Sequence, residues 1–233
     1  GAASKNVIHR YDPQRTKDEL EYIAKRVNNV DELMLADLNF GMYKQDLVTS
    51  RMIEANRLKY DYPKSLNASG GKNLPERVIE AATNVTGWTL GTAMQSSDKD
   101  VLKAIQRSNI STDAYKKLIV FGNKNDSMKT SLDIILGLPN DSKEKHFETI
   151  RFGIDNDVNT VRMQQAMMLI GTKMASQEDR KKYGLKTKWR SISGSVGRYK
   201  IIDKKYPVVE VDEIIVGNNT LSHEDYVECR TMN

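Results

Sequence analysis

Short apolar runs and longer amphipathic stretches alternate along most of this chain. The apolar runs are too short for helices and predict buried strands at residues 33–36, 65–69, 88–94, 132–136 and 161–169. Apolar residues at helical spacing between these runs predict helices near 16–28 and 42–58, after Pro75, after Asp98, from Ser111 and after Ser142. Strands that alternate with helices favour an α/β fold with a parallel sheet and right-handed crossovers.

Several details of these elements can be read from the residues. The segment Thr16-Lys17-Asp18-Glu19 is typical of a capping box at the start of the first helix, and Ser97 is expected to cap a later one. The strand from Leu33 to Ala36 is expected to be buried on both faces. The buried side of the helix over 42–58 is expected to consist of Val48, Met52, Ala55 and Leu58.

The pattern changes beyond about residue 185. Residues 189–202 and 208–216 resemble two extended segments joined by 203–207, and Ser222 begins a short final helix. We therefore expect a partial barrel over residues 1–185 and, over 186–233, a hairpin and helix that pack on the barrel or across its open edge.

Composition limits the possible functions. The 233 residues, 39% of them hydrophobic, can bury one sizeable core. A net charge of +5 is too small to indicate a dedicated nucleic-acid binder. No apolar stretch approaches the roughly 20 residues that span a bilayer, and the single cysteine, Cys229, excludes an internal disulfide. These features predict a cytoplasmic protein with no membrane partner.

Polar clusters follow successive predicted strands. They are Asp37-Leu38-Asn39-Phe40-Gly41-Met42, Gly71-Lys72-Asn73, Gln95-Ser96-Ser97-Asp98 and Ile135-Leu136-Gly137-Leu138-Pro139. In a parallel barrel the loops after the strands build the active site at one face, so these residues predict a shared pocket and an enzyme. The chain has no Gly-x-Gly-x-x-Gly after its first strand and no phosphate loop, which favours a barrel over a nucleotide-binding open sheet.

In this order the clusters resemble the core domain of radical S-adenosylmethionine (SAM) enzymes, particularly those that accompany a cobalamin-binding domain. The resemblance covers most of residues 1–185 and implies an incomplete (β/α)6 TIM-like barrel of about five parallel strands. It implies reductive cleavage of SAM to a 5′-deoxyadenosyl radical that acts on an unknown substrate, with methyl transfer as one of several possible outcomes. An electron donor would be a partner, and cobalamin is a possible cofactor in a separate domain.

The same family holds a four-iron four-sulfur (4Fe-4S) cluster with a Cys-x3-Cys-x2-Cys loop after its first strand. This chain has no such motif, and Gly1-Ala2-Ala3-Ser4-Lys5 resembles the sequence that directly follows the last cluster cysteine. We therefore expect the ligands to lie outside the chain, which by itself would be inactive. An open barrel edge also predicts homo-oligomers through the first strand.

The resemblance also assigns residues to the SAM pocket and leaves the catalytic residues unknown. Those expected to contact SAM or the substrate are Asp37, Asn39, Ser69, Lys72, Gln95, Ser96, Arg107, Gly137, Leu138 and Gln164. A strand-end turn explains Asp37 equally well, and Gly70-Gly71 fits a turn that needs positive φ. The three histidines have no partner at metal-ligand spacing, so no metal is assigned to them.

Two other functions remain open. The chain would act as a non-catalytic barrel fragment, a binding or scaffolding module, if the cluster cysteines are lacking altogether. An aldolase-type barrel is disfavoured because no lysine sits at an apolar strand end, where a Schiff-base residue would be expected.

Overall fold

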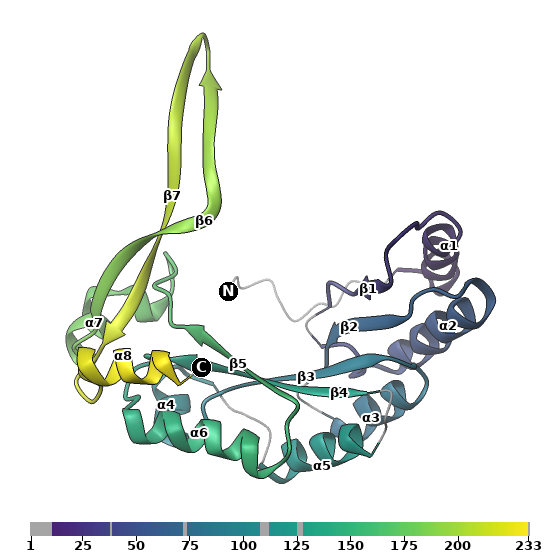
Figure 1. The fold of residues 1–233 in the computed structure, drawn as a ribbon, viewed down its shortest axis with the longest axis horizontal. Helices are drawn as coiled ribbons and strands as arrows, with labels where there is room; N and C mark the ends of the chain where they lie inside the picture. Colours follow the sequence, from purple (N-terminus) through teal and green to yellow (C-terminus); the bar gives the residue numbers. More distant parts are fainter. Residues whose placement is uncertain (1–10, 38, 72–73, 108–111, 125–127, 233) are drawn as a thin grey trace. The chain divides into compact units, whose positions relative to one another are not determined.

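The computed structural model describes residues 11–37, 39–71, 74–107, 112–124 and 128–232 (Figure 1). In these residues, helices alternate with five strands of one sheet: β1 (Glu32–Met34), β2 (Ser65–Ser69), β3 (Trp88–Gln95), β4 (Lys129–Leu136) and β5 (Thr160–Gln165). The helices are α1 (Pro13–Ala24), α2 (Lys44–Tyr60), α3 (Pro75–Thr83), α4 (Lys99–Ala104), α5 (Thr112–Asn123) and α6 (Lys143–Asp155). After β5 come a short 3-10 helix (Lys173–Ala175), α7 (Gln177–Tyr183), the hairpin β6 (Lys186–Ile201) and β7 (Lys204–Gly217), and α8 (His223–Thr231).

The strands lie in the sheet in the same order as in the chain. The order is β1-β2-β3-β4-β5, and β1, β2 and β3 pair in parallel, with Asn67 of β2 opposite Thr89 of β3. A doubly wound sheet would reverse its order at a switch point, which this sheet does not do within the described residues. The predicted α/β class, with a barrel-type sheet and a C-terminal hairpin, is confirmed.

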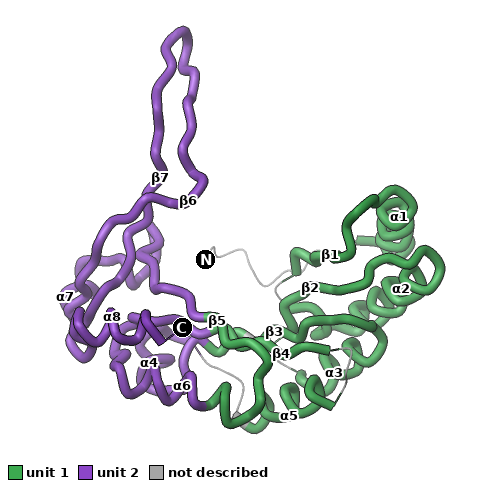
Figure 2. Tube along the Cα trace, viewed as in Figure 1, with its two compact units in different colours: residues 1–94, 109–133, 152–162 green, residues 95–108, 134–151, 163–233 purple. Residues whose placement is uncertain are grey.

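The described chain divides into two compact units (Figure 2). Unit 1 consists of residues 1–94, 109–133 and 152–162, and unit 2 of residues 95–108, 134–151 and 163–233. Each has apolar clusters of its own.

The core of unit 1 lies between one face of the sheet and helices α2, α3 and α5 (Figure 1). Alternate residues of β2 and β3, such as Leu66 and Leu90, point into it and are almost fully buried. Trp88 is fully buried at its centre: its ring centroid lies 5.2 Å from that of Phe40, and its Nε1 donates to the Ala68 carbonyl at 3.0 Å. This burial of apolar surface is the main force that holds the unit together.

In unit 2 the end of the hairpin pairs with the segment that follows β5. The Ile215 N–H donates to the Ala166 carbonyl at 2.9 Å, and the Met168 N–H donates to the Glu213 carbonyl at 2.8 Å. The Arg180 guanidinium makes two hydrogen bonds of 2.5 and 2.6 Å to the Glu213 carboxylate and lowers its pKa to about 2. This bidentate pair fixes α7 against β7.

Beyond this base the hairpin continues as a two-stranded ribbon (Figure 1). Most of its side chains are exposed. Its strands pair in antiparallel register, with Tyr199 opposite Tyr206, and an irregularity interrupts the pairing after Ser191. Trp189 is 66% exposed and Ile202, in the turn, is 88% exposed. A ribbon of this kind has no core of its own and depends on its base for order.

Three sequence predictions about the first helices and strand are wrong in detail. The first helix begins at Pro13, because Asp12 accepts a hydrogen bond from the Gln14 N–H and Pro13 suits the first helical position; Thr16 is therefore inside the helix. The strand from Leu33 buries only one face, since Met34 is 67% exposed on this edge strand.

The second helix buries a different side from the one predicted. Val48 and Leu58 are 39% and 73% exposed, Ala55 is exposed, and Met52 is half-buried, whereas Ser50 and Ile53 are buried. The Ser50 hydroxyl donates to the Leu47 carbonyl and accepts from Asn84 Nδ2, so a polar residue is accommodated on the packed face. Packing against α3 thus overrides the apolar pattern of α2.

Boundaries also differ near the C-terminus. β5 ends at Gln165, four residues earlier than expected, because the following residues turn to pair with β7. The hairpin turn consists of Ile202 and Asp203, so residues 204–207 belong to β7. The final helix is capped as predicted: the Ser222 Oγ accepts from the Asp225 N–H at 3.0 Å.

Candidate functional site

The face of the sheet opposite the helices of unit 1 is polar; we call it the open face. It is formed by Asn67, Thr89, Gly91, Ser131, Asp133 and Arg162 from strands β2 to β5. Several of these residues are only half-buried, in contrast to the fully buried Leu66 and Leu132 on the other face. An ordinary barrel interior is filled by bulky apolar side chains, so a polar and accessible one is suited to a ligand.

An ion pair anchors the open face. Arg162 Nε lies 2.8 Å from Asp133 Oδ1, and Arg162 Nη2 donates to Ser131 Oγ at 3.2 Å. A Cβ at position 91 would lie 3.2 Å from the Ser131 Oγ, so Gly91 leaves the space that this group occupies. A guanidinium has five N–H donors, and those outside these bonds can bind an acceptor on a ligand.

The loops after β1 and β2 lie against one another in unit 1. The Phe40 N–H donates to the Ser69 carbonyl at 3.0 Å, and the Gly71 N–H donates to the Phe40 carbonyl at 2.9 Å. A Cβ at Gly71 would come within 2.9 Å of the Asn39 carbonyl and 2.2 Å of Met42 Cγ. Close approach of the two loops therefore requires glycine at position 71.

The side chains predicted from these two loops are exposed. Asp37 Oδ1 accepts from the Asn39 N–H at 2.8 Å, which is the strand-end turn that the sequence allowed, and both residues, like Ser69, are accessible. Gly70 and Gly71 do not have the positive φ expected of them. Lys72 lies outside the described residues.

In unit 2, the polar residues Gln95 to Asp98 at the end of β3 lie in a segment that makes local hydrogen bonds. Gln95, with a φ of 64°, and Ser96 are both buried, and the Ser96 Oγ accepts from the Asp98 N–H at 3.1 Å. Asp98, and not Ser97, caps α4 by accepting from two backbone N–H groups, while the Ser97 hydroxyl lies 2.9 Å from Thr149 Oγ1. Asp98 is the stronger cap because its carboxylate also favours the helix dipole.

The glycine turn after β4 is covered by the C-terminal segment. The Gly137 N–H donates to Asp141 Oδ2 at 3.1 Å, and Asn218 Nδ2 donates to the Leu138 carbonyl at 2.8 Å. Leu138 is only 4% exposed. These backbone groups therefore already have protein partners.

Arg107 and Gln164 are the remaining predicted residues of unit 2, and both are exposed. Arg107 lies three residues beyond the end of α4. Gln164 is near the carboxyl end of β5.

The open-face pair was not among the predicted residues. Asp133 and Arg162 are 29 residues apart, and each has the polar character of an ordinary surface residue. The one signal within β4 is Asp133, which interrupts the apolar run Leu132 to Leu136 and lies on the same face of the strand as Ser131.

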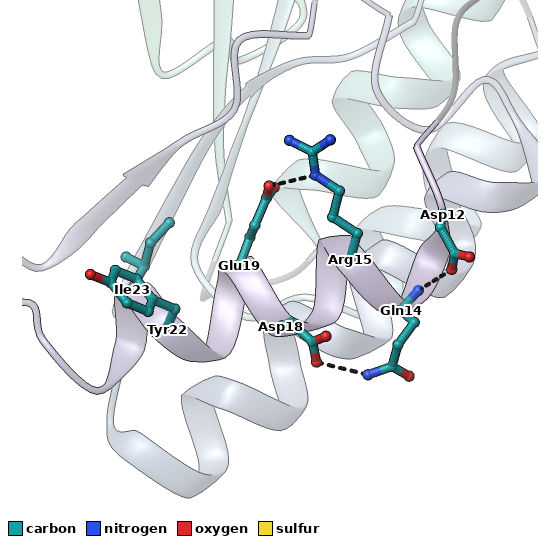
Figure 3. A pocket seen from close by; sticks show the side chains of 7 residues that line it. All are labelled: Asp12, Gln14, Arg15, Asp18, Glu19, Tyr22 and Ile23. Carbon is teal, nitrogen blue, oxygen red and sulfur yellow. Dashed lines mark hydrogen bonds and ion pairs between the residues drawn. The ribbon is translucent and has the colours of Figure 1, made fainter.

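A cavity of about 660 Å³ runs along α1 (Figure 3), and its lining contains none of the predicted residues. Its seven lining side chains come from α1 and the Asp12 cap, and Arg15 is turned to Glu19 by an ion pair of 2.8 Å. A groove lined by one helix offers no convergent polar groups, so we do not assign function to it.

The described residues do not offer a metal site. No group of three His, Cys, Asp or Glu side chains among them could hold an ion. Burial raises the pKa of the Cys229 thiol to about 11, so this cysteine is protonated at neutral pH. In the described part of the chain, no helix is both long and apolar enough to cross a membrane.

Two curated proteins are similar to the chain in sequence. It is 27% identical over 238 residues to 2-(S-pantetheinyl)-carbapenam-3-carboxylate methyltransferase from Streptantibioticus cattleyicolor, a match that covers 98% of this chain and 33% of that protein. It is 28% identical over 194 residues to the cobalamin-dependent radical SAM methyltransferase TokK from Streptomyces tokunonensis, which covers 80% and 28% respectively. The resemblance to radical SAM enzymes is confirmed.

The fold of this chain is also similar to that of a solved radical SAM structure. The radical SAM methyltransferase TsrM from Kitasatospora setae, solved with tryptophan and a SAM analogue, matches with a TM-score of 0.51 at 12% identity over 67% of this chain and 30% of that one. No family model matches the chain. The chain spans about a third of the length of the two curated relatives that it matches, 33% and 28%.

Proposed function

We propose that the chain forms the SAM-binding part of a cobalamin-dependent radical SAM methyltransferase. The observation that carries this proposal is the match to two methyltransferases over 98% and 80% of the chain. The sheet order and the polar open face support it, because a barrel of this type needs a polar interior to hold a nucleoside and a substrate.

The chain does not itself supply a 4Fe-4S site. Such a site needs three thiolates, whereas the sequence has one cysteine, and that cysteine is buried in unit 2. Cluster, cobalamin and electron donor would therefore come from residues or proteins other than those of this chain. When bound, they would supply the electron and the methyl carrier of the reaction.

The chain's own residues would bind and orient the small molecules. On the open face, Arg162 is held by Asp133 and would present its remaining N–H groups to oxygen or nitrogen atoms of SAM or the substrate. Gln164, two residues further along β5, would add an amide near the carboxyl end of the strand. The residues of unit 1 that were named from the sequence, Asp37, Asn39, Ser69 and Lys72, remain candidates for contacts with the same ligand.

Calorimetric titration of the chain with SAM tests the proposal. We expect saturable binding, about tenfold weaker in Gln164→Ala and in Arg162→Gln, because each variant removes hydrogen bonds to the ligand. Thr160→Ala, at the amino end of the same strand, is the matched control and is expected to bind as the original chain does.

The absence of saturable heat would overturn the SAM-binding proposal. An equal loss in Thr160→Ala would show that the carboxyl end of β5 is not the site. The single cysteine favours a second candidate, a non-catalytic binding or scaffolding module, for which no SAM binding is expected.

The exposed edge strand supports one further proposal about partners. β1 lies at the end of the sheet in the described residues, and Met34 is 67% exposed there. An uncovered parallel edge of this kind can pair with a second copy of the chain. Sedimentation of the chain would detect the resulting dimer.

A further inference from the structure

Unit 2 contains a cavity of about 580 Å³ whose lining is rich in lysine. Lys103 of α4, Lys145 of α6, Lys173 of the 3-10 helix and Lys182 of α7 all line it. Asp100 is the one carboxylate in the described lining, so the cavity has a marked excess of positive charge. None of the residues that line it belongs to the SAM candidates named above.

Two of the four ammonium groups have carboxylate partners. Lys145 Nζ lies 3.1 Å from Asp98 Oδ1 and donates to the Asn140 carbonyl, and Lys173 Nζ lies 3.0 Å from Asp179 Oδ1. Asp179 is itself buried, and its N–H is bound by the Ser176 hydroxyl. These contacts hold two sides of the cavity in place.

The other two ammonium groups are not neutralised within the described residues. Neither Lys103 nor Lys182 lies within ion-pair distance of a described carboxylate. Lys182 Nζ is 4.9 Å from the centre of the ring of Tyr183, a buried residue that also lines the cavity. Two ammonium groups without an ion-pair partner, with Asp100 as the one carboxylate beside them in the described lining, leave a positive excess that raises the local potential for anions.

The size and charge of the cavity indicate the class of ligand. A volume of about 580 Å³ is in the range of small-molecule pockets and exceeds what a single inorganic ion would fill. Lysine binds phosphate as a point charge through three rotatable N–H donors, and a phosphate group carries a charge of about −1.5 to −2 at pH 7, enough to pair with two ammonium groups. The ligand is therefore expected to carry a phosphate or diphosphate group on a larger body.

We propose that the lysine-lined cavity of unit 2 binds a phosphorylated small molecule, with Lys103 and Lys182 as the charge partners of its phosphate. The site is separate from the open face and does not depend on the proposed SAM binding. It would give the protein a second small-molecule ligand.

Titration of the chain with inorganic diphosphate, at about 0.15 M salt, tests the proposal. We expect saturable binding that is about tenfold weaker in Lys103→Gln and in Lys182→Gln, since each loses one charge-assisted bond. Lys99→Gln and Lys181→Gln remove exposed lysines from α4 and α7 that do not line the cavity, and both are expected to bind diphosphate normally. SAM titration of the first two variants is expected to be unchanged.

Lysine acetylation of the original chain gives a measurement that needs no variant. Bound diphosphate is expected to protect Lys103 and Lys182 from the reagent but not Lys99 or Lys181. Absence of saturable binding would overturn the proposal, as would equal losses in all four variants or equal protection of all four lysines, because a general charge effect would then account for the result.

Discussion

The two units are stabilised in different ways. Unit 1 has one continuous apolar cluster around Trp88, and its described charges lie mostly at the surface in pairs, such as Glu21 with Lys25 and Lys59. Unit 2 has two smaller clusters and contains most of the buried polar side chains, including Asp141, His146, Thr149, Asp179 and Asn218. A core of apolar contacts is insensitive to pH, whereas buried ionisable groups link folding to protonation.

Asp141 and His146 show this linkage most clearly, and in opposite directions. Burial raises the pKa of Asp141 to about 7, although its carboxylate accepts from the N–H groups of Gly137 and Ser142. Burial lowers the pKa of His146 to about 4, and its Nε2 has no partner among the described residues. Their effects on stability partly cancel between these pH values.

Trp88→Ala is expected to have the largest effect, a loss of about 5 kcal/mol in the free energy of unfolding. The substitution leaves a cavity in the core of unit 1 and removes the bond to the Ala68 carbonyl. Urea denaturation measures the loss, which we expect to be the same at pH 5 and pH 8. Trp189→Ala, on the exposed ribbon, is the control with almost no loss, and equal losses would contradict the assignment of the core.

Asp141→Asn is expected to remove the contribution of this carboxyl group to the pH dependence of folding, a loss of about 4 kcal/mol in the free energy of unfolding as pH rises. Because the folded pKa is above the unfolded one, this contribution is complete below about pH 4 and is lost as pH rises through about 7. Urea denaturation at several pH values measures it. Asp157→Asn, at an exposed site, is expected to keep the loss, and an unchanged slope in Asp141→Asn would refute the argument.

His146→Leu is expected to remove a smaller pH dependence, a loss of about 3 kcal/mol in the free energy of unfolding as pH falls. The folded pKa of His146 lies below its unfolded value of 6.5, so its contribution is present above pH 6.5 and is lost as pH falls through about 4. Acid denaturation followed by circular dichroism measures this. His223→Gln is the control, and a variant of His146 that still loses stability in acid would show that another group is responsible.

The features that the sequence predicted are local ones. Short apolar runs gave the five strands, and Ser222 capped the final helix as its pattern indicated. Asp12-Pro13 and the capping-box pattern from Thr16 to Glu19 are both helix starts by sequence, and the first helix uses Asp12-Pro13. Local patterns do not tell which of two signals a helix uses.

The features that could not be predicted depend on residues distant in the chain. The Asp133 and Arg162 pair, the covering of Leu138 by Asn218, and the lysines of the unit 2 cavity come together only through the fold. Likewise, α2 buries Ser50 in place of Val48 because α3 determines which side is packed. The strand ends identified the region of the site, and tertiary packing decided which side chains remain accessible there.

The boundary between the two units passes through β3, β4 and β5, so neither unit is a contiguous stretch of sequence. Deletion from either end therefore cannot isolate one unit without cutting the other. Synthesis on the ribosome, however, supplies the last residue of unit 1 at Arg162, while unit 2 has to wait for α8. All the residues of the apolar unit 1 are thus available to the nascent chain before those of the pH-sensitive unit 2.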